Sequence, residues 1–217
     1  MQFIDLKSQQ KRIRPALDEA INRVLEHGQY VMGPEVSQLE QALAEFVHSK
    51  FALSCANGTD ALTLSLMAMQ IGPADAVFCP SFTYSATAES IAILGATPVF
   101  VDIEPNTYNM CEKSLERTIK SILSDSTLSP KAVIIVDLFG QSANYPILTP
   151  IAKKYGLKII SDAAQGFGTK LNGQPPCHWA DIMTTSFFPA KPLGCYGDGG
   201  AIFTTVSYTH LTLPTKA

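Results

Sequence analysis

From residue 51 onward, short apolar runs alternate with amphipathic segments, and this alternation constrains the fold more than any other feature. Two of the runs, at 132–139 and 158–164, are rich in Val, Ile and Leu, which is typical of strands covered on both faces. The pattern predicts βαβ units, and hence an α/β fold with a mainly parallel sheet of about seven strands and helices on both faces. The expected strands span 51–55, 76–80, 97–102, 132–139, 158–164, 181–188 and 201–205, and the expected helices between them span 60–70, 85–94, 113–123 and 146–155.

Two amphipathic helices are expected before the first strand. Apolar residues recur at helical spacing over 13–25, with Gly28 where a helix stop belongs, and again over 34–47 after a proline suited to a first turn. We therefore expect an N-terminal helical segment over 1–50 and an α/β domain over 51–205.

The last residues, 206–217, differ in composition and periodicity from the rest of the chain. They are rich in Thr, lack periodicity and resemble a translated sequencing adapter. We expect a tail that is not native, on a chain cut near residue 205. An ordinary short tail is the alternative.

Composition and charge exclude several classes of protein. The 217 residues carry 16 Lys plus Arg against 19 Asp plus Glu, a net charge of −3, and no basic cluster of the kind that binds nucleic acid. An apolar share of 46% excludes disorder, while no apolar run approaches the roughly 18 residues of a membrane span. The charged N-terminus does not fit a secretory signal, and the five cysteines fit neither a disulfide framework nor a zinc ribbon. We expect a cytoplasmic protein without nucleic-acid or membrane partners and, given its scattered histidines, without a metal site.

Polar residues follow several of the expected strands. In open α/β sheets the ligand lies beyond the carboxyl ends of the strands, so these residues should converge on one edge. They occupy the segments 57–60, 81–84, 162–165 and 186–191, followed by a glycine-rich run at 194–200.

Each of these residues also has an interpretation that needs no ligand. Gly58 and Thr59 can form a turn and helix start, or hold a phosphate on free backbone amides. Tyr84, taken alone, is more typical of a core edge than of a stacking residue. Asp162 ends a strand expected to be buried on both faces, so its carboxylate needs a partner, which favours a functional role. Lys191 can be an ordinary surface lysine, but its apolar flank favours a low pKa and the free amine of a Schiff base.

Taken together, the parts suit pyridoxal 5′-phosphate. That cofactor needs a phosphate cradle, a flat aromatic ring, a carboxylate that keeps its pyridine nitrogen protonated, and a lysine that holds its aldehyde and moves a proton. A nicotinamide oxidoreductase would rest only on the α/β pattern, because the glycine run at 194–200 comes far too late for a dinucleotide fingerprint. A Walker A lysine motif is absent from the sequence.

Several strings then resemble one known family. They are NGTDAL at 57–62, VDLFGQ at 136–141, DAAQ at 162–165, and SFFPAKPLG at 186–194, which continues into GDGGA at 197–201. Through them the chain resembles the fold-type I pyridoxal-phosphate nucleotide-sugar aminotransferases of the DegT/DnrJ group.

Three further segments narrow the resemblance. They are 3–7, 27–30 and the pair Cys195 and Tyr196, which resemble bacterial enzymes that aminate UDP-2-acetamido-2-deoxy-3-oxo-glucuronate for O-antigen and other surface polysaccharides. The resemblance extends from about residue 2 to residue 205 and makes 51–205 the large, pyridoxal-phosphate-binding domain.

The resemblance implies roles for individual residues. Lys191 forms the Schiff base with the cofactor, Asp162 pairs with the pyridine nitrogen, Gln165 contacts the 3-hydroxyl group, and Tyr84 stacks on the ring. The residues implied in holding the phosphate are Gly58, Thr59 and Ser186. The residues implied at the nucleotide-sugar pocket are Gly28, Tyr30 and Ala190.

The resemblance also implies a ping-pong reaction, in which glutamate leaves as 2-oxoglutarate and the keto-sugar then takes the nitrogen. The family continues into a small C-terminal domain that is missing here, so the substrate half of the site is expected to be incomplete. The full-length protein is expected to be a homodimer. The alternatives are an aminotransferase for another sugar carbon, or an inactive truncated homologue with a structural or regulatory role. The related dehydratases lack the lysine, which is present here.

Overall fold

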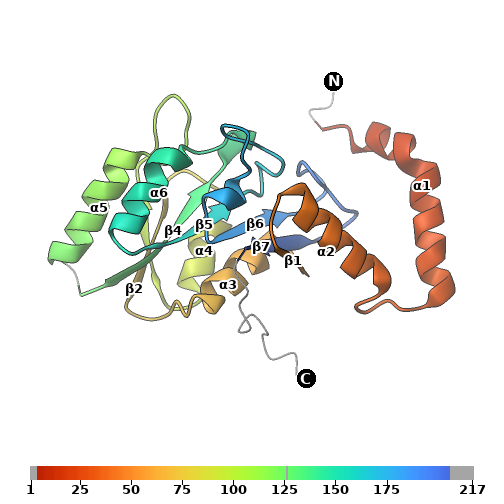
Figure 1. Ribbon diagram of the computed structural model, residues 1–217, viewed down its shortest axis with the longest axis horizontal. Coiled ribbons are helices and arrows are strands. Elements are labelled where there is room, and N and C mark those ends of the chain that lie inside the picture. Colours follow the sequence, from red (N-terminus) through yellow and green to blue (C-terminus); the bar gives the residue numbers. More distant parts are fainter. Residues whose placement is uncertain (1–3, 126, 206–217) are drawn as a thin grey trace.

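The computed structural model describes residues 4–125 and 127–205, and a single sheet forms its centre (Figure 1). The strands are β1 (Phe51–Cys55), β2 (Asp75–Pro80), β3 (Thr97–Val101), β4 (Ser129–Val136), β5 (Lys158–Asp162), β6 (Ile182–Ser186) and β7 (Gly200–Thr204). Their order across the seven-stranded sheet is β1-β7-β6-β5-β4-β2-β3. Neighbouring strands pair in parallel except at β7, which is antiparallel to β1 and β6. The predicted mainly parallel sheet is confirmed, with one reversed strand.

Helices cover both faces of the sheet, as predicted. The helices are α1 (Leu6–His27), α2 (Pro34–Phe46), α3 (Gly58–Ala68), α4 (Ala86–Ala92), α5 (Glu112–Asp125) and α6 (Tyr145–Lys154), with short 3-10 turns at Leu138–Gly140 and Pro176–His178. Helices α5 and α6 pack on one face, and α3 and α4 pack on the other (Figure 1). None of the described helices combines the length and the hydropathy that crossing a bilayer requires.

Successive side chains of the central strands point to opposite faces of the sheet, and both faces are buried. In β2, Val77 and Cys79 lie in the cluster with α3 and α4, whereas Phe78 between them lies in the cluster with α5 and α6. Successive side chains of a strand point to opposite faces, so a strand covered on both sides must be apolar throughout.

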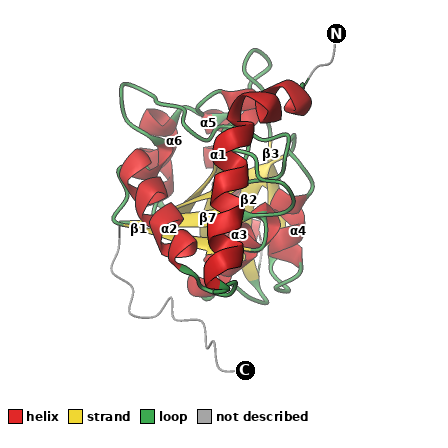
Figure 2. Ribbon diagram, turned by 90° about the vertical axis from the view of Figure 1, so that its right-hand side faces the viewer, coloured by secondary structure: helices red, strands yellow, loops and turns green. Residues whose placement is uncertain are grey.

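The N-terminal helices lie beside one end of the sheet (Figures 1 and 2). Helix α1 ends at Gly28, which caps it in the left-handed conformation at φ +68°, as the sequence predicted. Leu43 of α2 and Val47, which follows the helix, pack against β6 and β7, whereas no residue of α1 is buried. The division into a helical segment and an α/β domain stays a prediction, and the expected tail at 206–217 lies outside the described residues.

Strand β4 ends three residues earlier than the sequence predicted. The expected strand ran to residue 139, but β4 ends at Val136 and a tight turn follows. In that turn the Asp137 carboxylate accepts the N–H of Ala143 at 2.8 Å, and Phe139 adopts φ +56°. The carboxylate therefore folds the chain back where the hydrophobic pattern alone indicated more strand.

Candidate functional site

A cavity of about 630 Å³ opens at the carboxyl ends of the parallel strands. Its lining comes from segments that follow β1, β2, β5 and β6, which is where ligands bind in open α/β sheets. Eight of the predicted site residues line it, namely Gly58, Thr59, Tyr84, Asp162, Gln165, Ser186, Ala190 and Lys191. Gly28 and Tyr30 do not line this cavity.

Asp162 is the buried carboxylate of the cavity. It ends β5 with 6% of its surface exposed. Its Oδ2 accepts the hydroxyl of Thr87 at 3.2 Å, and its Oδ1 accepts the N–H of Ala164 at 3.1 Å. Burial raises the pKa of Asp162, while these two hydrogen bonds and the positive charge of Lys191 act in the opposite direction. A positively charged partner would therefore stabilise the ionised form of this buried carboxylate.

The N-terminus of α3 lines the cavity and is suited to binding an anion. Asn57 caps this helix by accepting the N–H of Asp60 at 2.8 Å on its side-chain oxygen. The N–H groups of Gly58 and Thr59, in the first turn, have no acceptor within the helix. Free amides together with the helix dipole favour a phosphate or carboxylate at this point.

Gly58 also brings α3 close to the end of β6. A Cβ atom at Gly58 would lie 2.7 Å from the Cβ atom of Ser186, which no side chain tolerates without movement. The Ser186 oxygen accepts the N–H of Phe188 at 3.2 Å, which leaves its own proton free to donate to a ligand. The two residues predicted to share a phosphate are thus in direct contact.

Lys191 lies half-buried in the turn after β6. Its backbone N–H donates to the carbonyl of Phe188 at 2.8 Å, which fixes this turn. A Cβ atom at Gly194 would lie 2.4 Å from the carbonyl oxygen of Pro189, so only glycine lets the chain double back here. Asp198, from the same glycine-rich loop, also lines the cavity.

Gln165 and Tyr84 complete the predicted cofactor residues. The Oε1 atom of Gln165 accepts the N–H of Phe139 at 2.8 Å. Tyr84 lines the cavity with 69% of its surface exposed. Its role as a stacking residue stays a prediction.

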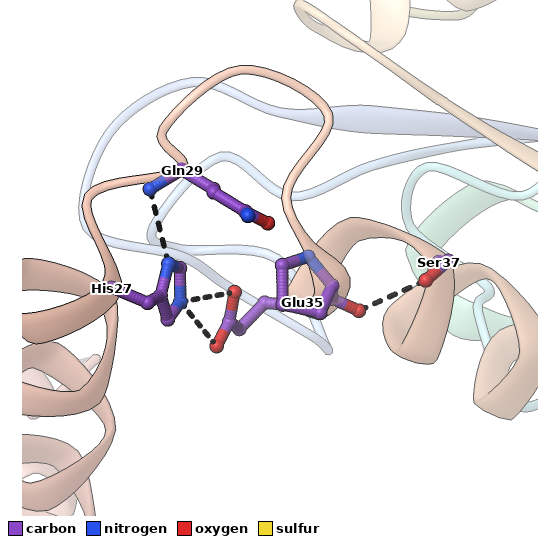
Figure 3. Close-up of polar contacts among 5 residues, drawn as sticks. His27, Gln29, Glu35 and Ser37 are labelled. Carbon is purple, nitrogen blue, oxygen red and sulfur yellow. Dashed lines mark hydrogen bonds and ion pairs between the residues drawn. The ribbon is translucent and has the colours of Figure 1, made fainter.

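The loop that carries Gly28 and Tyr30 is held by a histidine (Figure 3). Nδ1 of His27 accepts the N–H of Gln29 at 3.0 Å, so the ring proton of a neutral imidazole lies on Nε2. Nε2 then donates to both carboxylate oxygens of Glu35, at 3.1 and 3.2 Å. We call these hydrogen bonds of His27 to Gln29 and Glu35 the His27 clamp. Tyr30, in the loop that they hold, has 65% of its surface exposed. Contact of Gly28 and Tyr30 with a nucleotide-sugar stays a prediction.

Asp137, which belongs to the string at 136–141, is a fully buried carboxylate next to the site for which no role was predicted. Asp137 is unexposed, and burial raises its pKa to about 7, against hydrogen bonds from Ala143 and Tyr145 that lower it. The phenol oxygen of Tyr145 also lies 2.8 Å from the hydroxyl of Ser161. The available signal was a carboxylate inside a segment predicted to be a buried strand, because such a group needs partners.

The histidine spacing predicted no metal site, and the structure adds one cluster of potential ligands elsewhere. One ligand atom each of Glu104, Cys111 and Glu112 lies within 4.8 Å of the others. Glu104 and Glu112 line a second cavity that shares no lining residue with the first. Exposed and half-exposed acidic groups commonly gather without an ion, so this cluster is not assigned a function.

Comparisons with known proteins agree with this geometry. A model of the DegT/DnrJ/EryC1/StrS aminotransferase family matches residues 11–210. The UDP-2-acetamido-2-deoxy-3-oxo-D-glucuronate aminotransferase of Pseudomonas aeruginosa is 54% identical over 204 residues, which cover 94% of this chain and 55% of that protein. A DegT DnrJ EryC1 StrS aminotransferase from Brucella abortus superposes with a TM-score of 0.93 at 50% identity, over 95% of this chain and 56% of that one. NtdA from Bacillus subtilis, solved with bound cofactor PMP, gives a TM-score of 0.83 at 31% identity, over 95% and 45% of the two chains.

The chain spans about half the length of the curated relatives it matches. That half contains the sheet and the cavity described above. The family model covers nearly all of the chain, and the match to the Brucella abortus structure covers 95% of it. The chain therefore belongs to the DegT/DnrJ/EryC1/StrS aminotransferase family.

Proposed function

We propose that the protein transfers an amino group from glutamate to a keto nucleotide-sugar, with pyridoxal 5′-phosphate as cofactor. The observation that carries the proposal is the pairing of a buried carboxylate, Asp162, with a half-buried amine, Lys191, on one cavity that the N-terminus of α3 also lines. We further propose a homodimer acting in the cytoplasm, in the synthesis of a surface polysaccharide.

The residues of the cavity fit this cofactor chemically. Its phosphate is a dianion, which suits the free N–H groups of Gly58 and Thr59 and the donor hydroxyl of Ser186. Its pyridine nitrogen is a base, which suits the carboxylate of Asp162, since a proton shared between them relieves the cost of burying that charge. When bound, the cofactor supplies an electron sink for a carbon that loses a proton.

The chain's own residues would then divide the work. Asp162 would hold a proton on the ring nitrogen, and the hydroxyl of Thr87 keeps that carboxylate oriented. Lys191 would hold the cofactor through its amine and, when that amine is free, would accept and return a proton as a general base and acid. Gly58, Thr59 and Ser186 would hold the phosphate.

The choice of sugar rests on resemblance rather than on the cavity. The Pseudomonas aeruginosa relative bears the name of an aminotransferase for UDP-2-acetamido-2-deoxy-3-oxo-D-glucuronate, and its identity to this chain supports the same substrate here. Other relatives are named for different nucleotide-sugars, at 39% and 42% identity. The sugar and its ring position therefore need a direct assay.

The test joins residues 1–205 to the C-terminal half of the Pseudomonas aeruginosa relative and supplies pyridoxal phosphate, glutamate and the UDP-linked 3-keto-sugar. We expect formation of 2-oxoglutarate together with the aminated sugar, and a loss of at least ~100-fold in Lys191→Ala. The matched control, Lys170→Ala, removes an exposed lysine outside the cavity and should keep full activity. A folded, cofactor-loaded protein that turns over no keto-sugar would contradict the proposal and favour a regulatory role.

A further inference from the structure

The orientation of the Gln165 side chain is fixed by chemistry. A backbone N–H can only donate, so the N–H of Phe139 selects the oxygen of the Gln165 amide, at 2.8 Å. The nitrogen of that amide, Nε2, is thereby turned the other way, and Gln165 lines the cavity. Gln165 therefore offers the cavity a hydrogen-bond donor only while the N–H of Phe139 stays in place.

Phe139 is not held by a regular element. It sits in the turn at 138–142 with φ +56°, a conformation that costs a residue with a bulky side chain free energy. Gly140 follows at φ +80°, a left-handed conformation that favours glycine. A turn with two successive residues in left-handed conformations needs further contacts to keep one conformation.

Asn109 braces this turn from a different part of the chain. Its side-chain oxygen accepts the N–H of Leu138 at 3.2 Å, and its side-chain nitrogen donates to the carbonyls of Gln141 at 3.1 Å and Ser142 at 3.4 Å. The side chain thus forms hydrogen bonds with both ends of the turn that contains Phe139. Only 5% of the surface of Asn109 is exposed, so its amide depends on these partners for its hydrogen bonds.

Asn109 is itself anchored by its backbone. Its carbonyl accepts the N–H of Glu104 at 2.8 Å, and its N–H donates to the hydroxyl of Thr107 at 3.3 Å. These bonds hold the loop between β3 and α5, which brings Asn109 to the turn after β4. The brace therefore spans two loops at the same edge of the sheet.

We infer that Asn109 is a positioning residue, which holds the 138–142 turn so that the N–H of Phe139 orients the Gln165 amide and presents its Nε2 donor to an acceptor on the ligand. Asn109 itself does not line the cofactor cavity. For the identity of that ligand, the inference rests on the proposed function.

The first test follows Phe139 and Gln165 in the isotope-labelled chain by NMR, without cofactor. In Asn109→Ala we expect hydrogen exchange of the Phe139 amide to rise about tenfold and the side-chain NH₂ signals of Gln165 to shift or broaden. Asn109→Asp is the second variant, which keeps the volume and the acceptor for Leu138 but loses both donors. The matched control is Ser114→Ala, because the Ser114 hydroxyl is also buried but accepts the N–H of Asp102 instead. Unchanged Phe139 exchange and Gln165 signals in folded Asn109 variants would overturn the inference.

The second test asks whether Asn109 acts through Gln165. We expect the affinity of the chain for pyridoxal phosphate, followed by absorbance, to fall about tenfold in Asn109→Ala and in Gln165→Ala, and no further in the double variant. A double variant in which the two losses multiply would overturn the coupling, as would an unchanged affinity in Asn109→Ala. If the wild-type chain shows no absorbance band with pyridoxal phosphate, cofactor binding by this chain fails as a premise, and the NMR comparison still decides the role of Asn109.

Discussion

The phenol oxygen of Tyr145 lies 3.2 Å from Oδ2 of Asp137, and neither side chain is exposed to solvent. The same oxygen contacts the hydroxyl of Ser161, so strand β5, helix α6 and the turn after β4 meet in one buried polar network. Burial dominates the titration of this network and raises the pKa of Asp137 to about 7. The core beneath the cavity therefore contains a carboxyl group that titrates near neutral pH.

This pKa predicts how stability changes with pH. A folded-state pKa above the ordinary value of 3.8 favours the folded state at low pH, and this contribution is lost as the pH rises through about 7. We expect the free energy of unfolding, measured relative to Asp137→Asn, to fall between pH 4 and pH 7 by up to about 4 kcal/mol. Urea denaturation of both proteins across this range measures it. A difference that stays flat with pH would refute the assignment.

Gly58 should be intolerant of any side chain. Because its Cβ position lies 2.7 Å from the Cβ atom of Ser186, we expect Gly58→Ala to lower the free energy of unfolding by about 1–3 kcal/mol and to weaken binding of pyridoxal phosphate. Gly72→Ala is the matched control, since no atom lies within 4 Å of its Cβ position, and it should be neutral or slightly stabilising. Urea denaturation and cofactor titration compare the two. Equal stability of both variants would argue against the close contact.

Thr87 should set the pH range in which the cofactor binds. Its hydroxyl donates to Asp162 and lowers the pKa of that carboxyl, so Thr87→Val should raise the pKa further. We expect the acid limb of cofactor affinity to move up by about one pH unit, because a hydrogen bond to a charged group is worth roughly that much. Titrations between pH 5 and pH 8 measure this shift. Ser65→Ala, which removes a buried hydroxyl that donates within α3, should leave the limb in place.

Much of this architecture follows from the sequence alone. The apolar runs predicted every strand of the sheet, and the rule that ligands bind at the carboxyl ends of strands brought Asp162, Gln165 and Lys191 together correctly. The turn after β4 could not be predicted from local backbone preferences. It depends on hydrogen bonds of Asp137 with Ala143 and of Phe139 with Gln165. The antiparallel direction of β7 likewise depends on its neighbours, since strand periodicity is the same in either direction.

The long-range hydrogen bonds could not be predicted from the sequence either. Thr87 and Asp162 are 75 residues apart, and nothing in their local patterns links them. Asn109 lies in a loop that no local pattern links to the 138–142 turn, and only the structure places the two together. The residues proposed to contact the ligand follow strands and could be predicted, whereas the residues that support them could not.

The His27 clamp should control access to the loop at 28–33. Removing it in His27→Ala breaks the bonds to Gln29 and Glu35, so we expect chymotrypsin to cleave after Tyr30 about fivefold faster. Ser37→Ala removes a nearby bond, from the Ser37 hydroxyl to the carbonyl of Pro34, without touching the loop, and should cleave at the wild-type rate (Figure 3). Identical cleavage rates in all three proteins would show that the clamp does not hold the loop.

Covalent trapping shows whether Lys191 is the amine that binds pyridoxal phosphate. The chain is incubated with the cofactor, reduced with borohydride, digested and mapped by mass spectrometry, in parallel with Lys191→Ala and Lys170→Ala. We expect a single label on Lys191, which is lost in Lys191→Ala and retained in Lys170→Ala. Label scattered over the exposed lysines, or label that persists in Lys191→Ala, would exclude Lys191 as the cofactor-binding amine.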